Sequence, residues 1–121
     1  ADLSELARSG TRLGISTHSY AELAIALGLR PSYVSLGPVY PTASKQVGFA
    51  PQGCEAVKRW RALLPADMPV VAIGGITRDR APGVLEAGAD GIAVIGAITK
   101  ADDIDRAISE WLALWDARPD P

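Results

Sequence analysis

The sequence predicts an α/β fold built from successive parallel β/α units. Four short apolar runs have the composition of buried strands, and each is followed by a longer segment with helical periodicity. Strands that alternate with helices form parallel sheets with right-handed crossovers. The runs are almost continuously apolar, which is typical of parallel strands because helices cover them. No linker interrupts this order, so residues 1–121 are expected to form a single domain.

Each expected strand ends abruptly at small or hydroxyl-bearing residues. The first reads Arg-Leu-Gly-Ile-Ser and the second Tyr-Val-Ser-Leu-Gly, and the other two are rich in valine, alanine and isoleucine. The strands are expected at residues 12–16, 33–37, 70–73 and 92–95. A long loop is expected over residues 38–52, because this segment contains three prolines.

The helices are recognised from their caps and from their apolar spacing. Ser19 and Glu22 stand three residues apart and form a capping box. Either Thr77 or Asp79 is expected to cap a later helix. The helices are expected at residues 20–28, 53–64, 79–87 and 102–115, and a helix-like stretch opens the chain.

The last expected helix carries an apolar stripe. Ile104, Ile108, Trp111 and Trp115 repeat at helical spacing, which predicts one buried face. We therefore expect both tryptophans to lie in the core.

Composition and charge exclude several classes of function. Hydrophobic residues make up 48% of the chain, which predicts a globular protein. The net charge of −2 gives no electrostatic basis for binding nucleic acid. No apolar run approaches the ~20 residues of a membrane span, so no membrane partner is expected. Cys54 is the single cysteine and cannot form an internal disulfide, which favours a reducing cytoplasm.

The length and the start of the chain point to a partial domain. The chain has 121 residues, about half of the ~250 that a complete (β/α)₈ barrel needs. Its one methionine is Met68, so Ala1 is not a translation start unless an initiator methionine was removed. We therefore expect that an N-terminal portion precedes Ala1.

The expected strand ends carry the functional signal, because ligands of parallel α/β folds bind beyond the carboxyl ends of the strands. Gly74 and Gly75 end one strand and Gly96 ends the next. Glycine lets backbone N–H groups approach an anion closely, and a helix N-terminus adds partial positive charge. These positions predict a phosphate-binding site. The alternative is that the glycines only permit tight turns.

Hydroxyl and cationic residues follow the first two strands. Thr42, Ser44 and Lys45 either bind an anion, with the lysine as a point charge, or form a solvated loop. Ser16 either donates a hydrogen bond to an anion or is satisfied locally. His18 is a candidate acid–base group, although it also stands directly before a helix cap.

The acidic residues are informative by their positions. None of the fourteen stands at the end of an expected strand, and Asp90 precedes the fourth strand. Mg²⁺ is usually held by carboxylates together with substrate phosphates. The residues of this chain therefore predict no metal site.

At these residues the chain resembles the C-terminal half of the thiamine phosphate synthase family, whose members are also called thiamine-phosphate pyrophosphorylases. The motifs are GISTHS at 14–19, LGPVYPTASK at 36–45, VVAIGGI at 70–76 and EAGADGIAVIGAI at 86–98. IGGI and AGADG occur in many phosphate-binding barrels, whereas GPVYPTASK makes the match specific. The resemblance implies a TIM (β/α)₈ barrel of which this chain holds strands five to eight.

The resemblance also implies an activity and a set of site residues. Family members join hydroxymethylpyrimidine diphosphate to hydroxyethylthiazole phosphate and release pyrophosphate. Ser16 and Lys45 match diphosphate-binding positions, and Lys45 is the implied catalytic residue because it would neutralise charge on the departing pyrophosphate. The positions around the thiazole phosphate are matched by Thr42, Ser44, Gly75, Ile95 and Gly96. Ser44 stands where threonine is usual in the family, and Gly96 where serine is frequent.

The family's Mg²⁺ carboxylates belong to the half that this chain lacks. The isolated chain is therefore expected to be inactive, and it is expected to pair with the missing N-terminal half or with a second copy. Two rival functions stay open. One is a thiazole tautomerase with His18 as the acid–base group, and the other is a non-catalytic half-barrel that binds phosphate esters.

Overall fold

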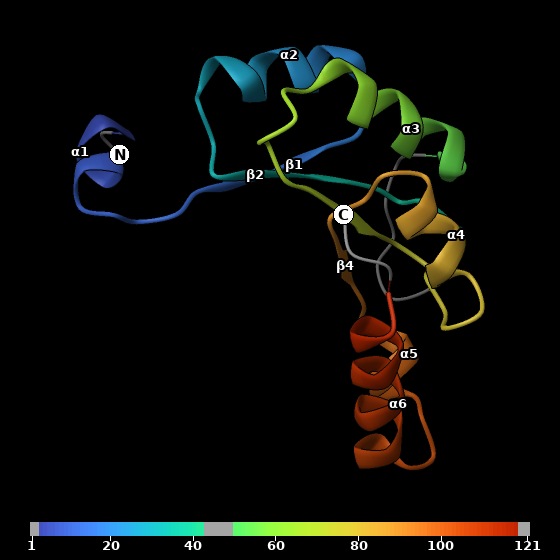
Figure 1. Cartoon of the computed structure of the whole chain (residues 1–121). Coiled ribbons are helices and arrows are strands. Elements are labelled where there is room, and N and C mark those ends of the chain that lie inside the picture. Colours follow the sequence, from blue (N-terminus) through green and yellow to red (C-terminus); the bar gives the residue numbers. More distant parts are fainter. Residues whose placement is uncertain (1–2, 43–49, 119–121) are drawn as a thin grey trace.

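The computed structural model describes residues 3–42 and 50–118 (Figure 1). Strands and helices alternate along the chain as the sequence predicts, except that a short helix over residues 96–99, which was not predicted, stands between the last strand and the last helix. The order is α1 (Leu3–Arg8), β1 (Gly14–Thr17), α2 (Tyr20–Gly28), β2 (Tyr33–Leu36), α3 (Gly53–Leu63), β3 (Val70–Ile73), α4 (Ala81–Glu86), β4 (Gly91–Ala93), α5 (Gly96–Thr99) and α6 (Ile104–Asp116).

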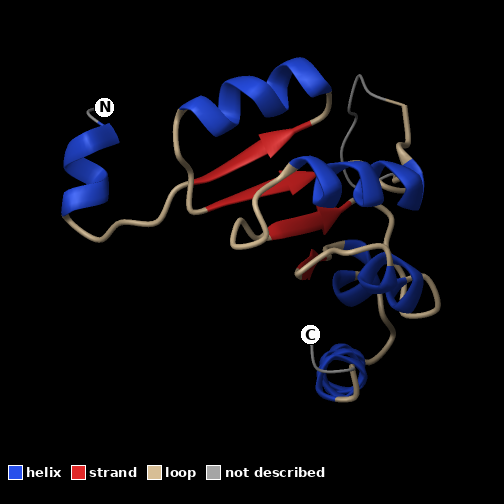
Figure 2. Ribbon diagram, turned by 45° about the horizontal axis from the view of Figure 1, so that its top comes forward, coloured by secondary structure: helices blue, strands red, loops and turns tan. Residues whose placement is uncertain are grey.

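The four strands form one parallel sheet in the order β1-β2-β3-β4, so the expectation of parallel β/α units is confirmed. Figure 2 shows the strands side by side and pointing the same way. Their pairing places Ser16 opposite Ser35, and Ser35 opposite Val71. Within the described sheet β1 and β4 are the edges, so each of these strands pairs on one side.

The two faces of the sheet differ in burial. Val34, Leu36, Val70 and Ala72 are fully buried and pack in one core with side chains from α2, α3 and α4. Alternate side chains point to opposite faces of a strand, so Ser35 and its neighbours in register, Ser16 and Val71, face the other way. Ser35 and Val71 are partly buried and Ser16 is exposed. Among the described residues, the helices α2, α3 and α4 therefore cover one face of the sheet and leave the other open.

A polar contact lies inside this apolar core. Thr17 is fully buried at the end of β1, and its hydroxyl donates to the carbonyl oxygen of Ser35 at 2.8 Å. The same hydroxyl accepts from Nε1 of Trp60 on α3 at 2.9 Å. A buried indole N–H needs an acceptor. This contact therefore fixes α3 against the first two strands.

The caps are partly as expected. Ser19 is the N-cap of α2, and its side chain accepts from the Glu22 amide. The cap expected at Thr77 or Asp79 is wrong, because α4 begins after Arg80 and has no side-chain cap. Its second position is Pro82, which has no N–H for a cap to receive.

The expectation for the last helix is also wrong in part. Ile104 and Ile108 are 47% and 40% exposed. Trp111 is partly buried against the core, whereas the ring of Trp115 is covered by Arg118 at 3.8 Å. The physical reason is the position of α6, which extends beyond β4 and away from the sheet (Figure 1). None of the described helices has the length and the apolar composition needed to cross a membrane.

The first prediction concerns the buried contact. Thr17→Val is expected to lower the free energy of unfolding by about 1–3 kcal/mol, because the Trp60 indole N–H loses its acceptor inside the core. Urea unfolding measures this change. Thr99→Val is the matched control, since Thr99 is exposed, and it is expected to change the midpoint little. Equal midpoints for the two variants would contradict the assigned role of the contact.

Candidate functional site

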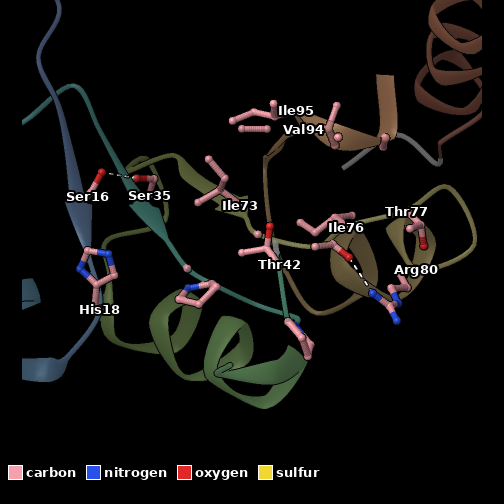
Figure 3. Close-up of a pocket in the computed structure, with 18 of the residues that line it drawn as sticks. Ser16, His18, Ser35, Thr42, Ile73, Ile76, Thr77, Arg80, Val94 and Ile95 are labelled. Atoms are coloured by element: carbon pink, nitrogen blue, oxygen red, sulfur yellow. Dashed lines mark hydrogen bonds between the residues drawn. The ribbon is translucent and has the colours of Figure 1, made fainter. Parts of the chain in front are cut away.

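A pocket of about 440 Å³ lies at the carboxyl ends of the strands, beside the open face of the sheet. Residues at or after the end of each strand line it, as the close-up in Figure 3 shows. They include Ser16 and His18, then Ser35, Gly37, Pro41 and Thr42, then Ile73, Gly74, Gly75, Thr77 and Arg80, and finally Ile95, Gly96 and Lys100.

The segment after β2 is held against the end of β3 by backbone hydrogen bonds. The Val39 amide donates to the carbonyl of Ile73 at 3.0 Å, and the Tyr40 amide donates to the carbonyl of Gly74 at 3.0 Å. The parallel pairing of the two strands thus continues past their ends. It brings Pro41 and Thr42 to the pocket.

The glycine pair is required for this approach. Gly74 and Gly75 have φ values of 107° and 63°, in the region that favours glycine. A Cβ on Gly74 would lie 2.6 Å from Cα of Pro38, and a Cβ on Gly75 would overlap the carbonyl oxygen of Pro41. The geometry thus accounts for both glycines through the close approach of two loops. Binding of phosphate by their N–H groups stays a prediction.

Two serines face the pocket from neighbouring strands. The Ser35 hydroxyl donates to the Ser16 hydroxyl at 3.2 Å (Figure 3). The sequence interpretation missed Ser35. The sequence could have indicated it, because Ser35 is a polar residue between the apolar residues of a strand. Such a position belongs to the face of the strand that helices do not cover.

His18 stands at the opposite side of the pocket from Arg80 (Figure 3). Its Nδ1 lies 2.9 Å from Oε1 of Glu22 on α2. Its carbonyl oxygen accepts from Nε2 of Gln52 at 2.8 Å, and the same Nε2 donates to the Gly37 carbonyl at 3.1 Å. The histidine is thus held by a carboxylate at its ring and by an amide at its backbone.

The charged side chains of the described lining favour an anion. Arg80 and Lys100 are lining residues, and the described lining contains no aspartate or glutamate. A concave site lined by one sign of charge attracts ligands of the opposite sign. The sequence interpretation missed both residues, because each follows a strand end by several positions.

Two nearby groups have shifted pKa values. The Thr77 hydroxyl donates to Oδ1 of Asp79 at 2.5 Å, and this hydrogen bond is the main cause that lowers the pKa of that carboxyl. The hydroxyl of Tyr40 contacts Sγ of Cys54 at 3.4 Å. This hydrogen bond, followed by burial, raises the pKa of Tyr40. The proton of the Thr77 hydroxyl is therefore donated to Asp79, and the thiol of Cys54 lies beside the Tyr40 hydroxyl.

The expected site residues fall into two groups. Those that line the pocket together are Ser16, His18, Thr42, Gly75, Ile95 and Gly96. Ser44 and Lys45 lie outside the described residues. The described ranges contain no group of three or more His, Cys, Asp or Glu side chains that could hold a metal ion.

Comparison with known proteins connects this chain to one family. The family model described as thiamine monophosphate synthase matches residues 1–98. A thiamine-phosphate synthase of Rhizobium etli is 50% identical over 113 residues, which cover 93% of this chain and 55% of that protein. A thiamine-phosphate synthase of Klebsiella pneumoniae is 51% identical, covering 93% of this chain and 53% of that protein.

A solved structure gives the same relationship. The thiamine phosphate pyrophosphorylase from Pyrococcus furiosus superposes with a TM-score of 0.76 at 32% identity. The match covers 94% of this chain and 53% of that one. The chain thus spans about half the length of the relatives it matches.

The second prediction tests the glycine turn. Gly75→Ala is expected to destabilise the fold by more than about 1 kcal/mol, because alanine is strained at positive φ and its Cβ overlaps Pro41. Gly83→Ala is the matched control. Gly83 lies inside α4 with nothing within 4 Å of a new Cβ, so this change is expected to stabilise by about 0.5–1 kcal/mol. Urea unfolding of both variants measures the change in the free energy of unfolding. No change in Gly75→Ala would contradict the inference that the two loops approach closely at this glycine.

Proposed function

Because this chain belongs to the thiamine monophosphate synthase family, we propose that the protein is a transferase that joins hydroxymethylpyrimidine diphosphate to hydroxyethylthiazole phosphate. One observation carries the proposal. The ends of all four strands meet at one pocket whose described charged side chains are an arginine and a lysine. Both substrates are phosphate esters, so a pocket of this charge suits them.

The proposed positions of the two substrates are those that the family resemblance implies, and the residues that would hold them line one pocket. The thiazole phosphate is received by Thr42 and by the backbone at Gly75 and Gly96, with the apolar side chain of Ile95 beside the ring. The diphosphate lies toward Ser16. A hydroxyl held by a neighbouring serine has a restricted set of orientations, and this favours a defined hydrogen bond to the anion.

The proposed reaction breaks the bond between the pyrimidine methylene carbon and the diphosphate oxygen. The thiazole nitrogen then forms a bond to that carbon, and pyrophosphate leaves with the bonding electrons. Lys45 is proposed to stabilise the negative charge that grows on the departing group. Ser44 is proposed to bind the thiazole phosphate beside Thr42.

Mg²⁺ is the cofactor that the family resemblance implies. The described lining offers no carboxylate, and the described ranges contain no cluster of metal-ligating side chains. These residues therefore do not fit a magnesium site. No step of the proposed reaction passes through the metal.

We further propose that the four strands are strands five to eight of a TIM barrel. The parallel order, the helices on one face and the open second face support this proposal. Ile104 and Ile108 on α6 are 47% and 40% exposed, and exposed apolar side chains favour association. The proposed occupant is an N-terminal half-barrel or a second copy of the chain, in a reducing cytoplasm that suits the single Cys54.

A second candidate function rests on His18. The carboxylate of Glu22 at its Nδ1 and its place in the pocket lining are the arrangement of an acid–base catalyst. Isomerisation of the thiazole phosphate, as in a thiazole tautomerase, needs such a group and needs no diphosphate site.

The third prediction separates these two functions by coupled assay of the complete protein. Lys45→Ala is expected to lower kcat of the synthase reaction by about 100-fold or more, because charge on the leaving pyrophosphate is no longer neutralised. His18→Ala is expected to keep most of the activity. Lys58→Ala, an exposed lysine paired with Glu55 on α3, controls for loss of charge. Loss of thiazole phosphate isomerisation in His18→Ala but not in Lys45→Ala would favour the tautomerase.

The fourth prediction concerns association. In light scattering, residues 1–121 are expected to form species larger than one chain, because apolar side chains and two strand edges are exposed. Replacing Ile104 and Ile108 with serine is expected to reduce the size of these species. A folded monomer in dilute buffer would defeat the proposal of a half-barrel that needs a partner.

A further inference from the structure

We propose that Arg80 is a phosphate-binding residue of this pocket and recognises the ester phosphate of the thiazole substrate. The inference deepens the function proposed above and rests on it. Neither the strand-end argument nor the resemblance assigns a role to this arginine, which is the N-cap residue of α4.

Two contacts fix the guanidinium of Arg80 at the glycine turn. Its Nη1 donates to the carbonyl oxygen of Gly75 at 2.8 Å, which Figure 3 shows as a dashed line. The guanidinium carbon also lies 4.5 Å from the centre of the Tyr40 ring, within the range of a cation–π contact. The two partners come from different loops, one after β3 and one after β2. The charge is therefore held beside the turn that is expected to receive a phosphate.

The guanidinium keeps capacity for a ligand. It has five N–H donors in a planar fork. Within the described part of the chain, one of them donates a hydrogen bond, to the Gly75 carbonyl oxygen. Among the described residues, Arg61 and Arg78 pair with Asp90 and Glu110, whereas no ion pair is recorded for Arg80. The nearest acidic neighbour in sequence is Asp79, whose Oδ1 accepts from Thr77.

A phosphate ester is the ligand that fits this arrangement. Arginine binds phosphate through parallel N–H donors, and such charge-assisted bonds are strong and directional. The described lining has no carboxylate, and Asp79, whose pKa is lowered mainly by its hydrogen bond from Thr77 and also by the charge of Arg80, is not among the lining residues. Since the side chain is already positioned, binding costs less side-chain entropy than it would for a free arginine.

The test is a comparison of two ligands by isothermal titration to the complete protein. The probes are hydroxyethylthiazole phosphate and the unphosphorylated hydroxyethylthiazole. Arg80→Gln removes the charge and keeps side-chain N–H donors. We expect this variant to bind the phosphate ester about tenfold or more weakly, as loss of a charge-assisted hydrogen bond requires, and to bind the alcohol as the wild type does.

Arg78→Gln is the matched control, because Arg78 carries the same charge two residues away, is exposed, and pairs with Glu110 instead of lining the pocket. It is expected to bind both probes unchanged. Arg80→Lys is expected to bind the ester with intermediate affinity, since it keeps the charge but loses the planar fork. Equal weakening by Arg80→Gln and Arg78→Gln would overturn the inference, because the effect would then be general charge.

The outcomes distinguish the inference from the function on which it rests. If wild type binds the thiazole phosphate and Arg80→Gln binds it equally well, the role of Arg80 is wrong and the proposed function stands. If wild type binds inorganic phosphate but not the thiazole phosphate, the proposed substrate is wrong. A weaker binding of inorganic phosphate by Arg80→Gln would then still support an anion-binding role. Weakening of both ester and alcohol would assign Arg80 to folding of the turn and overturn its role in phosphate recognition.

Discussion

The close approach of two loop backbones is the constraint on which the pocket depends. The segment after β2 continues to pair with the end of β3 through hydrogen bonds to the carbonyls of Ile73 and Gly74. This pairing is possible because neither Gly74 nor Gly75 carries a Cβ, which would collide with the opposite segment. The same pairing brings Thr42 to the pocket and presents the Tyr40 ring to Arg80.

Because side chains alternate along β1 and β2, the residues that stabilise the core and the residues that line the pocket lie on opposite faces of the sheet. On the face that the helices cover, the buried Thr17 hydroxyl accepts a hydrogen bond from the indole N–H of Trp60. On the other face, Ser16 and Ser35 form a hydroxyl pair at the pocket. Adjacent residues of one strand thus have opposite environments, and a slip of one residue in the pairing would exchange them. The Thr17–Trp60 contact opposes that slip because it is satisfied in one register.

The sequence predicts positions that depend on topology better than positions that depend on tertiary contacts. Ser16 lies at the end of a strand, and Thr42 and Gly75 follow strands. In a parallel sheet the ends of the strands lie at one edge, so the convergence of these residues was foreseeable. Arg80 was not foreseeable, because its place is set by a contact with Tyr40 some forty residues earlier in the chain. The stripe of α6 shows the limit of periodicity. Helical spacing identified an amphipathic helix, but it does not state what covers the apolar face, and Ile104 and Ile108 are exposed.

The charges of the described pocket suggest that, in the proposed reaction, different residues bind the ester phosphate and stabilise the departing pyrophosphate. An ester phosphate needs donors and a fixed cation, and Arg80, Thr42 and the glycine turn are placed to supply them. Departure of pyrophosphate needs additional positive charge, because a group with several negative charges must be stabilised as its bond breaks. The described lining holds no carboxylate for a divalent ion, and Lys45 lies outside the described residues. Recognition of the thiazole phosphate is therefore the part of the proposed function that we assign to these residues.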